Sequence, residues 1–472
     1  MKEIEREHPE HVQRKAMWKK YRDLYAGGEQ FVASAREYLI ARHNEPAAIY
    51  GERLQRVFYE NYIGSIIDWY AATLFRREPV LTFEGPNEQG RRFFGEFAED
   101  CDFKGTGLSD FFRARLTEAL VSGSSLILVD FPRRNRAVAT RAEEEAAGLS
   151  RAFLAEYRPE DLTNWSRDEK GEYDWVVLRT SGLRKESLEG NWKRKTRWLY
   201  LDRERYQRFE RDEEAGGDPV LADEGLHALA KQGRVPLFEL RIPEGLWLMN
   251  KAALLQLEHF NKSNALAWGI TMSLFAMPVI FSDNKLEQTM GESYYLQLGP
   301  NDRFSWTEPE GKVHQIAEQN LARLREEIYR MCYLMTQAGG PLSGNPASGL
   351  SKQRDFSVTQ EVLRAYGDAV KDTMKKVLRA VNAAREDGLT VDVGGLDEFD
   401  IGDFSGELAD AERLLALGAG SMTLRREVLR KLAHKYLCDT RQDVKDRISQ
   451  EISEWVASTE SGGANGSEKG SQ

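Results

Sequence analysis

The stretch "GGPLSGNPASGLSKQRDFS", from Gly339 to Ser357, lies between two long segments whose apolar residues recur at helical spacing. It is rich in glycine, proline and serine, which favour turns and loops over regular structure. Connections between packed helices usually take about 2–8 residues, so this segment is too long for an ordinary helix connection. A loop of this length between two helices indicates a functional segment of the fold.

The segments on both sides of this loop predict long helices. Residues 313–337 precede it and residues 355–386 follow it. Upstream, residues 244–275 predict another long helix, and residues 276–312 predict a short mixed segment of strands around a small helix. The apolar stripe of the helix after the loop comprises Val358, Val362, Tyr366, Val370, Thr373, Val377 and Val381.

The first half of the chain predicts a mixture of helices and strands. Residues 52–79 predict one continuous helix, ended by its terminal proline because proline disfavours helix in the residue before it. Residues 108–122 predict another helix, which Gly123 ends before the buried strand "SSLILVDFP". Residues 153–242 have strand-like runs of aromatic and β-branched residues between turn signals.

Charge and composition limit the class of protein. The 472 residues are 41% hydrophobic and 30% charged, and the formal net charge is −10. Tight, static nucleic-acid binders usually carry a basic excess, so this class is disfavoured, whereas a surface that DNA slides past is compatible with an acidic chain. The basic stretch 184–197 and the acidic stretch 210–224 are expected to be solvated hairpin ends.

Compartment signals are weak but consistent. No apolar run reaches the length of about 18 residues that a membrane span needs, and the N-terminus lacks the apolar segment of a secretory signal. The three cysteines, Cys101, Cys332 and Cys438, are far apart, so we expect buried thiols in a reducing compartment and no disulfide. The expectation is a soluble protein with no membrane association.

Motifs for catalysis are missing. Gly344 and Gly349 have the spacing of a phosphate-binding loop, but Leu350 and Ser351 occupy the positions of its lysine and hydroxyl residue. The chain contains no HExxH and no GxSxG. Of the seven histidines, His8 and His11 form a weak ligand-like pair that we expect at the surface of a frayed terminus. We therefore predict no catalytic site, no metal and no cofactor.

Several stretches, taken in order, resemble the portal proteins of tailed bacteriophages, which are also called head-to-tail connectors. "ENYIGSIIDWYAATLFRREPVL" (Glu60–Leu81) looks like the early portal helix and the strand that follows it, and "EALVSGSSLILVDFP" (Glu118–Pro132) resembles the next helix–glycine–strand unit. "AEYRPEDLTNW" (Ala155–Trp165) and "LALGAGSMTLRREVLRKL" (Leu415–Leu432) resemble later steps of that family. The resemblance spans residues 15 to 455, and it depends on the order of the stretches, since none of them is as specific as a catalytic motif.

The resemblance implies an α+β, predominantly helical portal fold that assembles into a ring. Its regions would be a wing, a stem, a clip and a crown. On this chain they would be an N-terminal α/β wing at 1–245, stem helices at 246–275 and 313–337, a clip at 276–312, a tunnel loop at 338–354, a long wing helix and return at 355–404, a helical crown at 405–456 and a disordered tail at 457–472. The clip would be short, so the resemblance does not define its fold.

Two sets of residues follow from this mapping. In the tunnel loop, polar and basic residues would face DNA without reading its sequence: Ser343, Asn345, Ser348, Ser351, Lys352 and Arg354. In the stem, cations interleave with Glu258, Glu318, Glu326 and Glu327, which suits charge pairing between neighbouring subunits and suits a solvated helix face almost as well. The stem cations are Lys251, Lys262, Arg323, Arg325 and Arg330. Aspartate at Leu254 or Leu257 is expected to prevent folding or ring formation.

The implied function is a ring of twelve subunits, by analogy with the family, at one vertex of the capsid. Double-stranded DNA would pass through it non-specifically during packaging and ejection. Its partners would be the terminase large subunit, the head–tail adaptor, and the major capsid and scaffold proteins, and it would reach the virion after assembly in the host bacterial cytoplasm. It would have no catalysis of its own, because ATP hydrolysis would belong to the terminase.

Two alternatives from other classes stay open. The first is a cytosolic multidomain enzyme with an unrecognised site, such as a metal-dependent nuclease that holds its ion on scattered carboxylates. The second is a scaffold protein that only assembles partners. An enzyme predicts a pocket with convergent polar groups and a small oligomer, whereas a portal predicts a very large ring.

Overall fold

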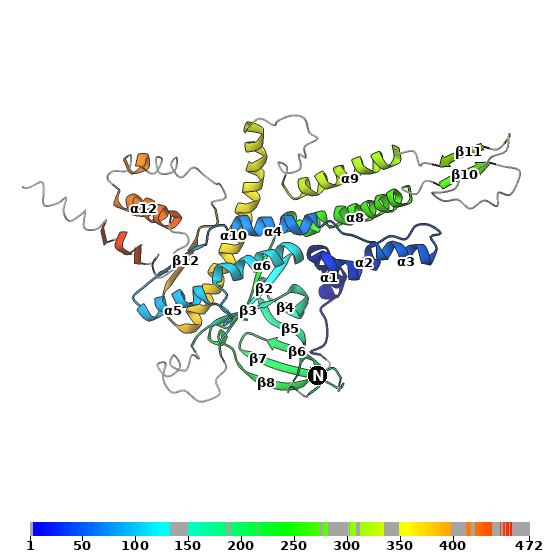
Figure 1. Ribbon diagram of the computed structural model, residues 1–472. Coiled ribbons are helices and arrows are strands. Elements are labelled where there is room, and N and C mark those ends of the chain that lie inside the picture. The colour runs from blue at the N-terminus through cyan, green and yellow to red at the C-terminus, as the bar shows by residue number, and fades with distance from the viewer. Residues whose placement is uncertain are drawn as a thin grey trace, which may run out of the picture. The chain divides into compact units, whose positions relative to one another are not determined.

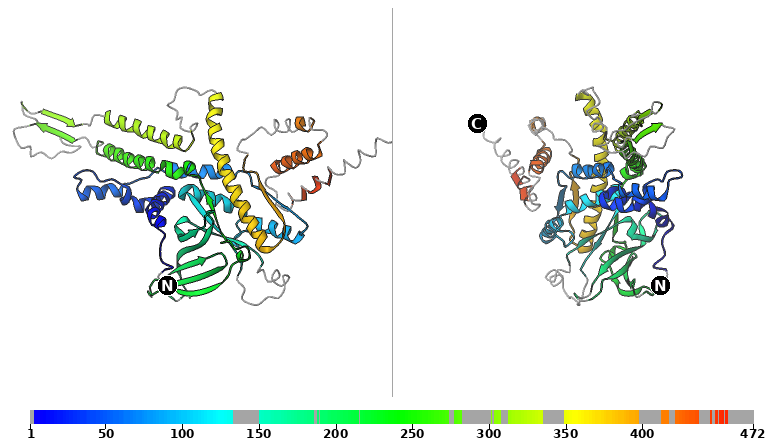
Figure 2. Two further views of the ribbon diagram at one scale, coloured as in Figure 1. Left: turned by 180° about the vertical axis from the view of Figure 1, so that it is seen from behind. Right: turned by 45° about the vertical axis from the view of Figure 1, so that its right-hand side comes forward.

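The computed structural model of the chain divides into two compact units, whose elements are shown in Figures 1 and 2. The first comprises Met1–Arg22, Ile66–Asn250 and Phe356–Gln472, and the second comprises Asp23–Ser65 and Lys251–Asp355. The structure describes residues 3–132, 150–185, 188, 190–214, 216–273, 277–281, 301, 303–307, 312–334, 349–397, 412–416, 421–436, 444, 447–448, 450–452 and 454–455.

The first unit is built on antiparallel sheets. In the smaller one, β2 (Ser124–Asp130) lies between β3 (Phe153–Tyr157) and β9 (Leu237–Arg241). The larger has the order β4-β5-β6-β7-β8. Its strands are β4 (Leu162–Arg167), β5 (Tyr173–Arg184), β6 (Lys193–Leu201), β7 (Arg205–Asp212) and β8 (Val220–Leu226). These strands confirm the strand-like pattern of residues 153–242.

The two sheets share a hydrophobic core. Apolar side chains of both pack into one cluster: Leu126, Leu128, Leu162, Tyr173, Val176, Leu178, Leu201, Val235 and Leu237. Strand β2 is buried along nearly its whole length, as the continuous apolar run in its sequence predicted. Helix α6 (Leu108–Ser122) packs against β2 and ends at Gly123, whose φ of 91° is one that glycine adopts without a steric cost.

A second layer of the first unit surrounds helix α10 (Gly349–Arg385). Strands β1 (Val80–Glu84) and β12 (Thr390–Gly394) pair antiparallel, and helix α5 (Glu88–Glu99) contacts β1. The predicted apolar stripe of α10 is confirmed from Val362 onward, where its residues are buried, whereas Val358 is 46% exposed. Helix α12 (Met422–Tyr436) lies in the region assigned to the crown.

Helix α10 begins earlier than predicted. It includes residues 349–354, which the sequence placed in the loop, so Ser351, Lys352 and Arg354 are helical. The glycine and serine content of this stretch suggested a loop, but Leu350, Lys352 and Arg354 have high helix propensity and extend the helix by more than a turn. The last six residues of the predicted tunnel loop, 349–354, therefore belong to α10 instead.

Helix α1 (Pro9–Ala26) is attached to the first unit by polar contacts. The Trp18 indole donates to the Ser122 carbonyl at 3.1 Å. His11 is only 1% exposed, with Nε2 3.0 Å from the Glu160 carbonyl, and the His8 ring stacks on Trp165 at 3.9 Å. The prediction that both histidines lie on a frayed surface is therefore wrong, because aromatic and main-chain partners from distant segments cover them.

Arg22, near the end of α1 within the first unit, pairs with two carboxylates. Its guanidinium donates to both Glu118 oxygens, at 2.6 and 3.1 Å, and to both Glu160 oxygens, one of them at 2.7 Å. The three side chains are 20%, 13% and 22% exposed. Burial raises the pKa of the Glu118 carboxyl, but the hydrogen bond and charge of Arg22 outweigh it and hold that pKa below its ordinary value.

The second unit is formed by helices and one pair of strands. Helices α2 (Gly28–Tyr38) and α3 (Ala47–Gln55) belong to its first segment. Its longest elements are α8 (Leu248–Ser273) and α9 (Lys312–Met331), and between them in the sequence β10 (Met277–Phe281) pairs antiparallel with β11 (Arg303–Thr307). Figure 1 shows α8 and α9 side by side, next to this strand pair.

The single helix predicted over residues 52–79 is wrong. Helix α3 ends at Gln55 and α4 (Tyr62–Leu74) begins seven residues later, with an extended segment between them. Asn61 ends this segment, since its Oδ1 accepts from the Gly64 amide at 2.9 Å and its Nδ2 donates to the Tyr25 carbonyl at 2.8 Å. Such side-chain capping starts a new helix in spite of a continuous apolar pattern.

Helix α9 also ends before the predicted Gln337. Tyr333 has a φ of 61°, and the amide of Leu334 donates to the Tyr329 carbonyl at 2.9 Å, which closes the last turn. Cys332 and Leu334 are buried and hold the end of the helix in place. Cys101 and Cys332 are free thiols, as predicted, and Cys438 lies outside the described residues.

Candidate functional site

The candidate site is the helix pair α8–α9, which the sequence assigned to a stem. The two helices run antiparallel, because contacts join Lys251 to Tyr333 and Lys262 to Asn320. At about 1.5 Å per residue, the 26 residues of α8 extend about 39 Å. Helix α9 is amphipathic, with Ile328 buried and Val313 and Ile316 more than 60% exposed.

Three of the five predicted stem cations find partners within their own chain. The Lys251 ammonium hydrogen-bonds the Tyr333 hydroxyl and lies 4.4 Å from the centroid of its ring. Lys262 pairs with Glu258 and bonds the Asn320 amide oxygen, both at 2.9 Å. Arg330 pairs with Glu327 one turn away. These contacts fix the side chains along the helices, and each exposed pair contributes little to stability.

The two remaining stem cations differ in their surroundings. Arg323 is exposed and has no ion-pair partner among the described residues. Arg325 acts electrostatically on two neighbours. At Tyr62 it opposes the burial that raises the pKa, and at His259 it adds to the burial that lowers the pKa. Pairing between subunits, which the sequence suggested for all five cations, is therefore best proposed for Arg323 and Arg325.

Helix α8 binds main chain through two side-chain amides. Gln256 Nε2 donates to the Glu60 carbonyl at 2.7 Å, and its Oε1 accepts from the Ile63 amide at 3.3 Å. Asn264 Nδ2 donates to the Phe58 carbonyl at 2.9 Å, and its Oδ1 accepts from the Phe58 amide at 3.1 Å. These bonds satisfy the main-chain groups of the extended segment between α3 and α4, which explains why that segment is not helical.

Asn261, a third side-chain amide of α8, binds main-chain groups between α2 and α3 in the same way. Asn261 Nδ2 donates to the Tyr38 carbonyl at 3.1 Å, and its Oδ1 accepts from the Ile40 amide at 2.9 Å. Nearby, Tyr59 stacks on Phe31 with ring centroids 3.9 Å apart. We call Gln256, Asn261 and Asn264 the α8 amides. They were missed by sequence reasoning because polar residues on a long helix resemble an ordinary solvated face.

His259 lies among the α8 amides and is 3% exposed. Its Nε2 is 3.5 Å from a Glu60 carboxylate oxygen, and Tyr62 packs edge-on with ring centroids 5.1 Å apart. Burial lowers the pKa of the His259 imidazole, and Arg325 acts in the same direction, whereas Glu60 opposes both. His259 therefore packs between α8 and the start of α4.

The only part of the predicted tunnel loop that the structure describes is helical. Ser343, Asn345 and Ser348 lie outside the described residues. Ser351, Lys352 and Arg354 lie in the first two turns of α10. Of the predicted clip, the structure describes the strand pair β10–β11, and Phe281 and Phe304 on it are exposed. The predicted tail at 457–472 also lies outside the described residues.

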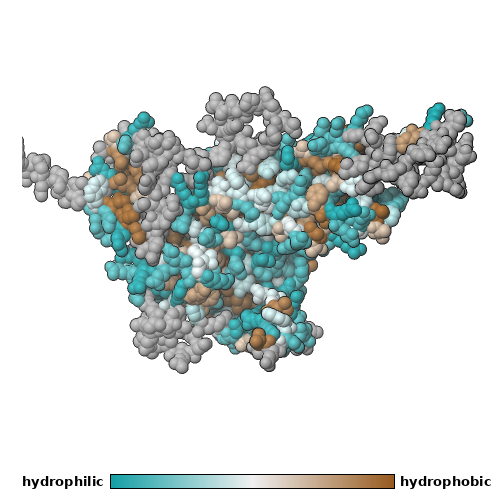
Figure 3. Space-filling model, in the orientation of Figure 1, coloured by the Kyte–Doolittle hydropathy of each residue, from teal (hydrophilic) through white to brown (hydrophobic). Residues whose placement is uncertain are grey.

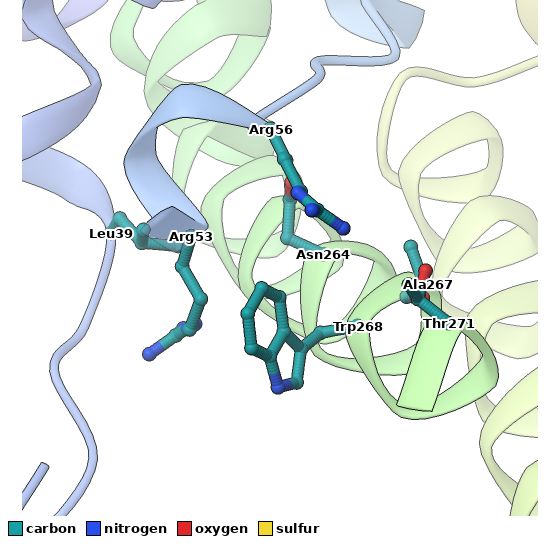
Figure 4. A pocket seen from close by; sticks show the side chains of 7 residues that line it. All are labelled: Leu39, Arg53, Arg56, Asn264, Ala267, Trp268 and Thr271. Carbon is teal, nitrogen blue, oxygen red and sulfur yellow. The ribbon is translucent and has the colours of Figure 1, made fainter. Parts of the chain in front are cut away.

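A small pocket lies beside α8 (Figure 4). Its cavity is about 90 Å³, and its lining residues are Leu39, Arg53, Arg56, Asn264, Ala267, Trp268 and Thr271. Arg53 is tied to Glu45 by a buried ion pair, at 2.6 Å, and the Arg56 guanidinium lies 5.7 Å from the Trp268 ring centroid. The lining includes no nucleophile and no pair of acid–base groups. The pocket holds only a few atoms, and its polar groups are largely occupied.

The described residues contain neither a candidate metal site nor a candidate membrane span. In the described residues, no group of three or more histidines, cysteines or carboxylates is placed to hold a metal ion. Within the same residues, no helix combines the length and apolar character of a membrane span. Asp100, a loop carboxylate, pairs with Arg151 at 2.8 Å and accepts from the Gly105 amide at 3.0 Å.

Comparison with known proteins gives no match to any protein-family model and no match among curated proteins. Among solved structures, the chain is similar to one in the neck of an empty gene transfer agent particle computed with C6 symmetry. The identity is 13%, the match covers 78% of this chain and 90% of that chain, and the TM-score is 0.42.

Two further structures belong to the same kind of particle. One is the virion of a native gene transfer agent, at 14% identity, with 84% of this chain and 97% of that chain covered and a TM-score of 0.38. The other is the neck of the native particle computed with C12 symmetry, at 13% identity, with 78% and 89% covered and a TM-score of 0.38. At these identities and TM-scores the likeness assigns neither a family nor a function to this chain.

Proposed function

We propose that this chain is the subunit of a portal ring in a phage-like particle, through which double-stranded DNA is packaged and ejected. The observation that carries the proposal is the order of elements along the chain. An antiparallel pair of long helices, α8 and α9, brackets the strand pair β10–β11, and a further segment leads to the 37-residue helix α10. This order matches the stem, clip, tunnel loop and wing helix that the portal resemblance implies.

In this proposal the stem helices of neighbouring subunits line an axial channel. The strand pair β10–β11 forms the clip, where the terminase large subunit docks during packaging and the head–tail adaptor later binds. The ring has twelve subunits and lies in the virion at one capsid vertex, after assembly with capsid and scaffold proteins in the bacterial cytoplasm. Closure into a ring requires a heterologous interface, in which different faces of each subunit meet.

Negative-stain electron microscopy of the purified full-length protein, with mass photometry on the same sample, tests the proposal. We expect rings with a central hole and a mass of ten or more subunits. A closed two-fold dimer in every condition, including added scaffold protein, would overturn it and favour the nuclease alternative. Scaffold is included because ring assembly of this kind can require it.

A substitution at Leu254 distinguishes an effect on ring assembly from an effect on folding. The sequence treated Leu254 and Leu257 alike, but Leu254 is 70% exposed whereas Leu257 is half-buried. We therefore expect Leu254→Asp to change the free energy of unfolding by less than about 0.5 kcal/mol and to reduce ring formation strongly, because Leu254 lies on the outer face of α8. Leu257→Asp, the matched control, should lower both the free energy of unfolding and the extent of ring formation. Normal rings from Leu254→Asp would show that this face of α8 contacts no neighbour.

The segment between α9 and α10 is proposed to contact passing DNA without sequence readout. A deletion within this segment tests the proposal. It should cover residues 342–348 and stop before α10, because residues 349–351 are helical. We expect rings to form normally and the fraction of DNA-filled heads to fall several-fold in a particle assembly assay. A variant with the same seven residues in scrambled order should fill heads normally, because composition and length are retained. Normal filling with the deletion would contradict the assignment.

A further inference from the structure

Two neighbouring hairpins of the five-stranded sheet carry opposite charge. The first, formed by β5 and β6, is basic at its tip, which we define as the described residues 183–185, 188 and 190–195. The second, formed by β7 and β8, is acidic, and we call its described residues 213–214 and 216–224 the acidic hairpin. Lys195 on β6 is opposite Asp212 on β7, so both tips lie at the same end of the sheet.

Exposed charges without ion pairs occur on both hairpins. Within the described part of the chain, Arg184 and Lys185 on the basic tip have no ion-pair partner, and Arg194 is exposed beside them. On the acidic hairpin, Glu214 and Asp218 are likewise exposed and without an ion pair among the described residues. Other charges nearby are paired within the chain, as in Lys193–Asp212 at 3.6 Å and Arg211–Glu213 at 3.1 Å. The remaining charges are therefore available to another molecule.

Both hairpins also expose large apolar side chains. Trp192 and Leu188 on the basic tip are 61% and 92% exposed, and Leu183 is 59% exposed. On β8, Val220 and Leu221 are 68% and 42% exposed, and both lie near the end of the strand that carries the hairpin tip. Figure 3 shows apolar residues at the surface of this sheet, in the lower part of the view. Solvated hairpin ends, which the sequence suggested, need no such residues, whereas tryptophan and arginine together are typical of protein contact sites.

The position of the two hairpins in the sheet fits a ring. In the order β4-β5-β6-β7-β8, strand β8 forms one lateral edge. On the other side, β4 pairs with β5 only up to Leu178, so the part of β5 that leads into the basic tip pairs with β6 alone among the described strands. The contacts of a ring are heterologous, so each subunit offers two different surfaces to its neighbours. The basic tip and the acidic hairpin are two such surfaces with opposite charge.

We infer that the basic tip of one subunit docks on the acidic hairpin of the next subunit, with Trp192 and Leu188 packing against Val220 and Leu221. This inference rests on the proposed ring, and the occupant it commits to is a second copy of this chain. Complementary charge fixes which edges meet and disfavours the pairing of like tips. The burial of apolar side chains supplies the attraction that exposed ion pairs alone do not.

A charge-swap series in the full-length protein tests the contact. The tip variant is Arg184→Glu/Lys185→Glu/Arg194→Glu, the hairpin variant is Glu214→Lys/Asp218→Lys/Glu224→Lys, and the combined variant carries all six changes. Mass photometry measures the fraction of protein in rings. We expect each three-residue variant to lose at least tenfold in ring fraction at equal concentration. The combined variant should recover it, because its acidic tips meet basic hairpins.

A matched control variant has the same change in net charge, but its substitutions lie elsewhere on the chain. Lys104→Glu/Lys170→Glu/Arg205→Glu alters three exposed lysines and arginines away from the basic tip and should assemble like the parent protein. Recovery in the combined variant also excludes misfolding, since a second set of reversals cannot repair a damaged fold. Normal assembly of the tip variant, or no recovery in the combined variant, overturns the inference and leaves the ring itself intact. Failure of the parent protein to form rings overturns the proposed function instead.

Discussion

We expect the Arg22→Met variant to be about 3–5 kcal/mol less stable than the parent protein at pH 7. The substitution keeps much of the side-chain volume but removes all the donors that the Glu118 and Glu160 carboxylates share. Two largely buried carboxylates would then be left without their cation, and the loss of one partner of a buried pair is costly because the remaining charge is uncompensated. Chemical denaturation followed by circular dichroism measures the difference.

The pH dependence of that difference gives a second, independent readout. In the parent protein the pKa of Glu118 is lowered, so its contribution to stability is complete above the ordinary glutamate pKa and is lost only as pH falls through the lower folded value. In the variant the Ser122 hydrogen bond and the charge of Arg158 still lower that pKa, but burial, the largest influence, raises it, so the folded state gains a proton at a higher pH than the parent protein does. The stability gap should therefore narrow from pH 7 to pH 4.5.

The control for this prediction is Arg92→Met. Arg92 forms an exposed pair with Glu96, with side chains 83% and 62% exposed, so we expect a change below about 1 kcal/mol at either pH. A gap for Arg22→Met that is equally small, or that does not vary with pH, would show that the carboxylates find other partners or water when Arg22 is removed.

Gly367→Ala is expected to destabilise the protein by about 3 kcal/mol, against the direction that helix propensity predicts. Glycine inside a helix costs about 1 kcal/mol relative to alanine, so α10 alone would gain from the change. A Cβ at this position, however, would lie 2.4 Å from the Leu396 carbonyl oxygen and 3.3 Å from Leu74 Cδ1. The first of these atoms is main chain and cannot rotate away, so α10 or the segment after β12 must shift.

Gly95→Ala in α5 is the matched control. Gly95 is also helical, but nothing lies within 4 Å of an added Cβ, so we expect this variant to be stabilised by about 0.5–1 kcal/mol. Thermal unfolding of the two variants side by side should move the transition in opposite directions. Equal stabilisation by both would mean that the close approach of α10 to Leu396 is relaxed in solution.

Local patterns predicted much of the fold. The buried positions of α10, the bounds of α6 and the strand β2 follow from apolar periodicity and one glycine, because each element is defined by residues close in the sequence. The order of the elements also permitted the portal resemblance. Where the prediction was wrong, a distant partner was responsible. The segment before α4 has a helical pattern, but its main-chain groups bond Gln256 and Asn264, about two hundred residues further along the chain.

The candidate site was predicted in outline only. Helices α8 and α9, which the sequence assigned to a stem, begin within two residues of the predicted positions. The end of α9 depends on Tyr333 in a left-handed conformation, which no typical turn residue predicts. The α8 amides could have been suspected from the number of asparagine and glutamine residues on an otherwise apolar helix, but their partners are main-chain groups without a sequence signature. Pairing of the stem cations with neighbours in the same chain depends on side-chain directions that spacing alone does not give.

The α8 amides have a consequence for how the sequence of this protein can change over evolution. A hydrogen bond to a main-chain carbonyl or amide is indifferent to the side chain of the residue that supplies it. Ile40, which is 67% exposed, and Glu60 can therefore be replaced by many residues without loss of these bonds. Gln256, Asn261 and Asn264 have no such freedom, so two segments of variable sequence would keep one shape through three invariant positions on a helix far away in the chain.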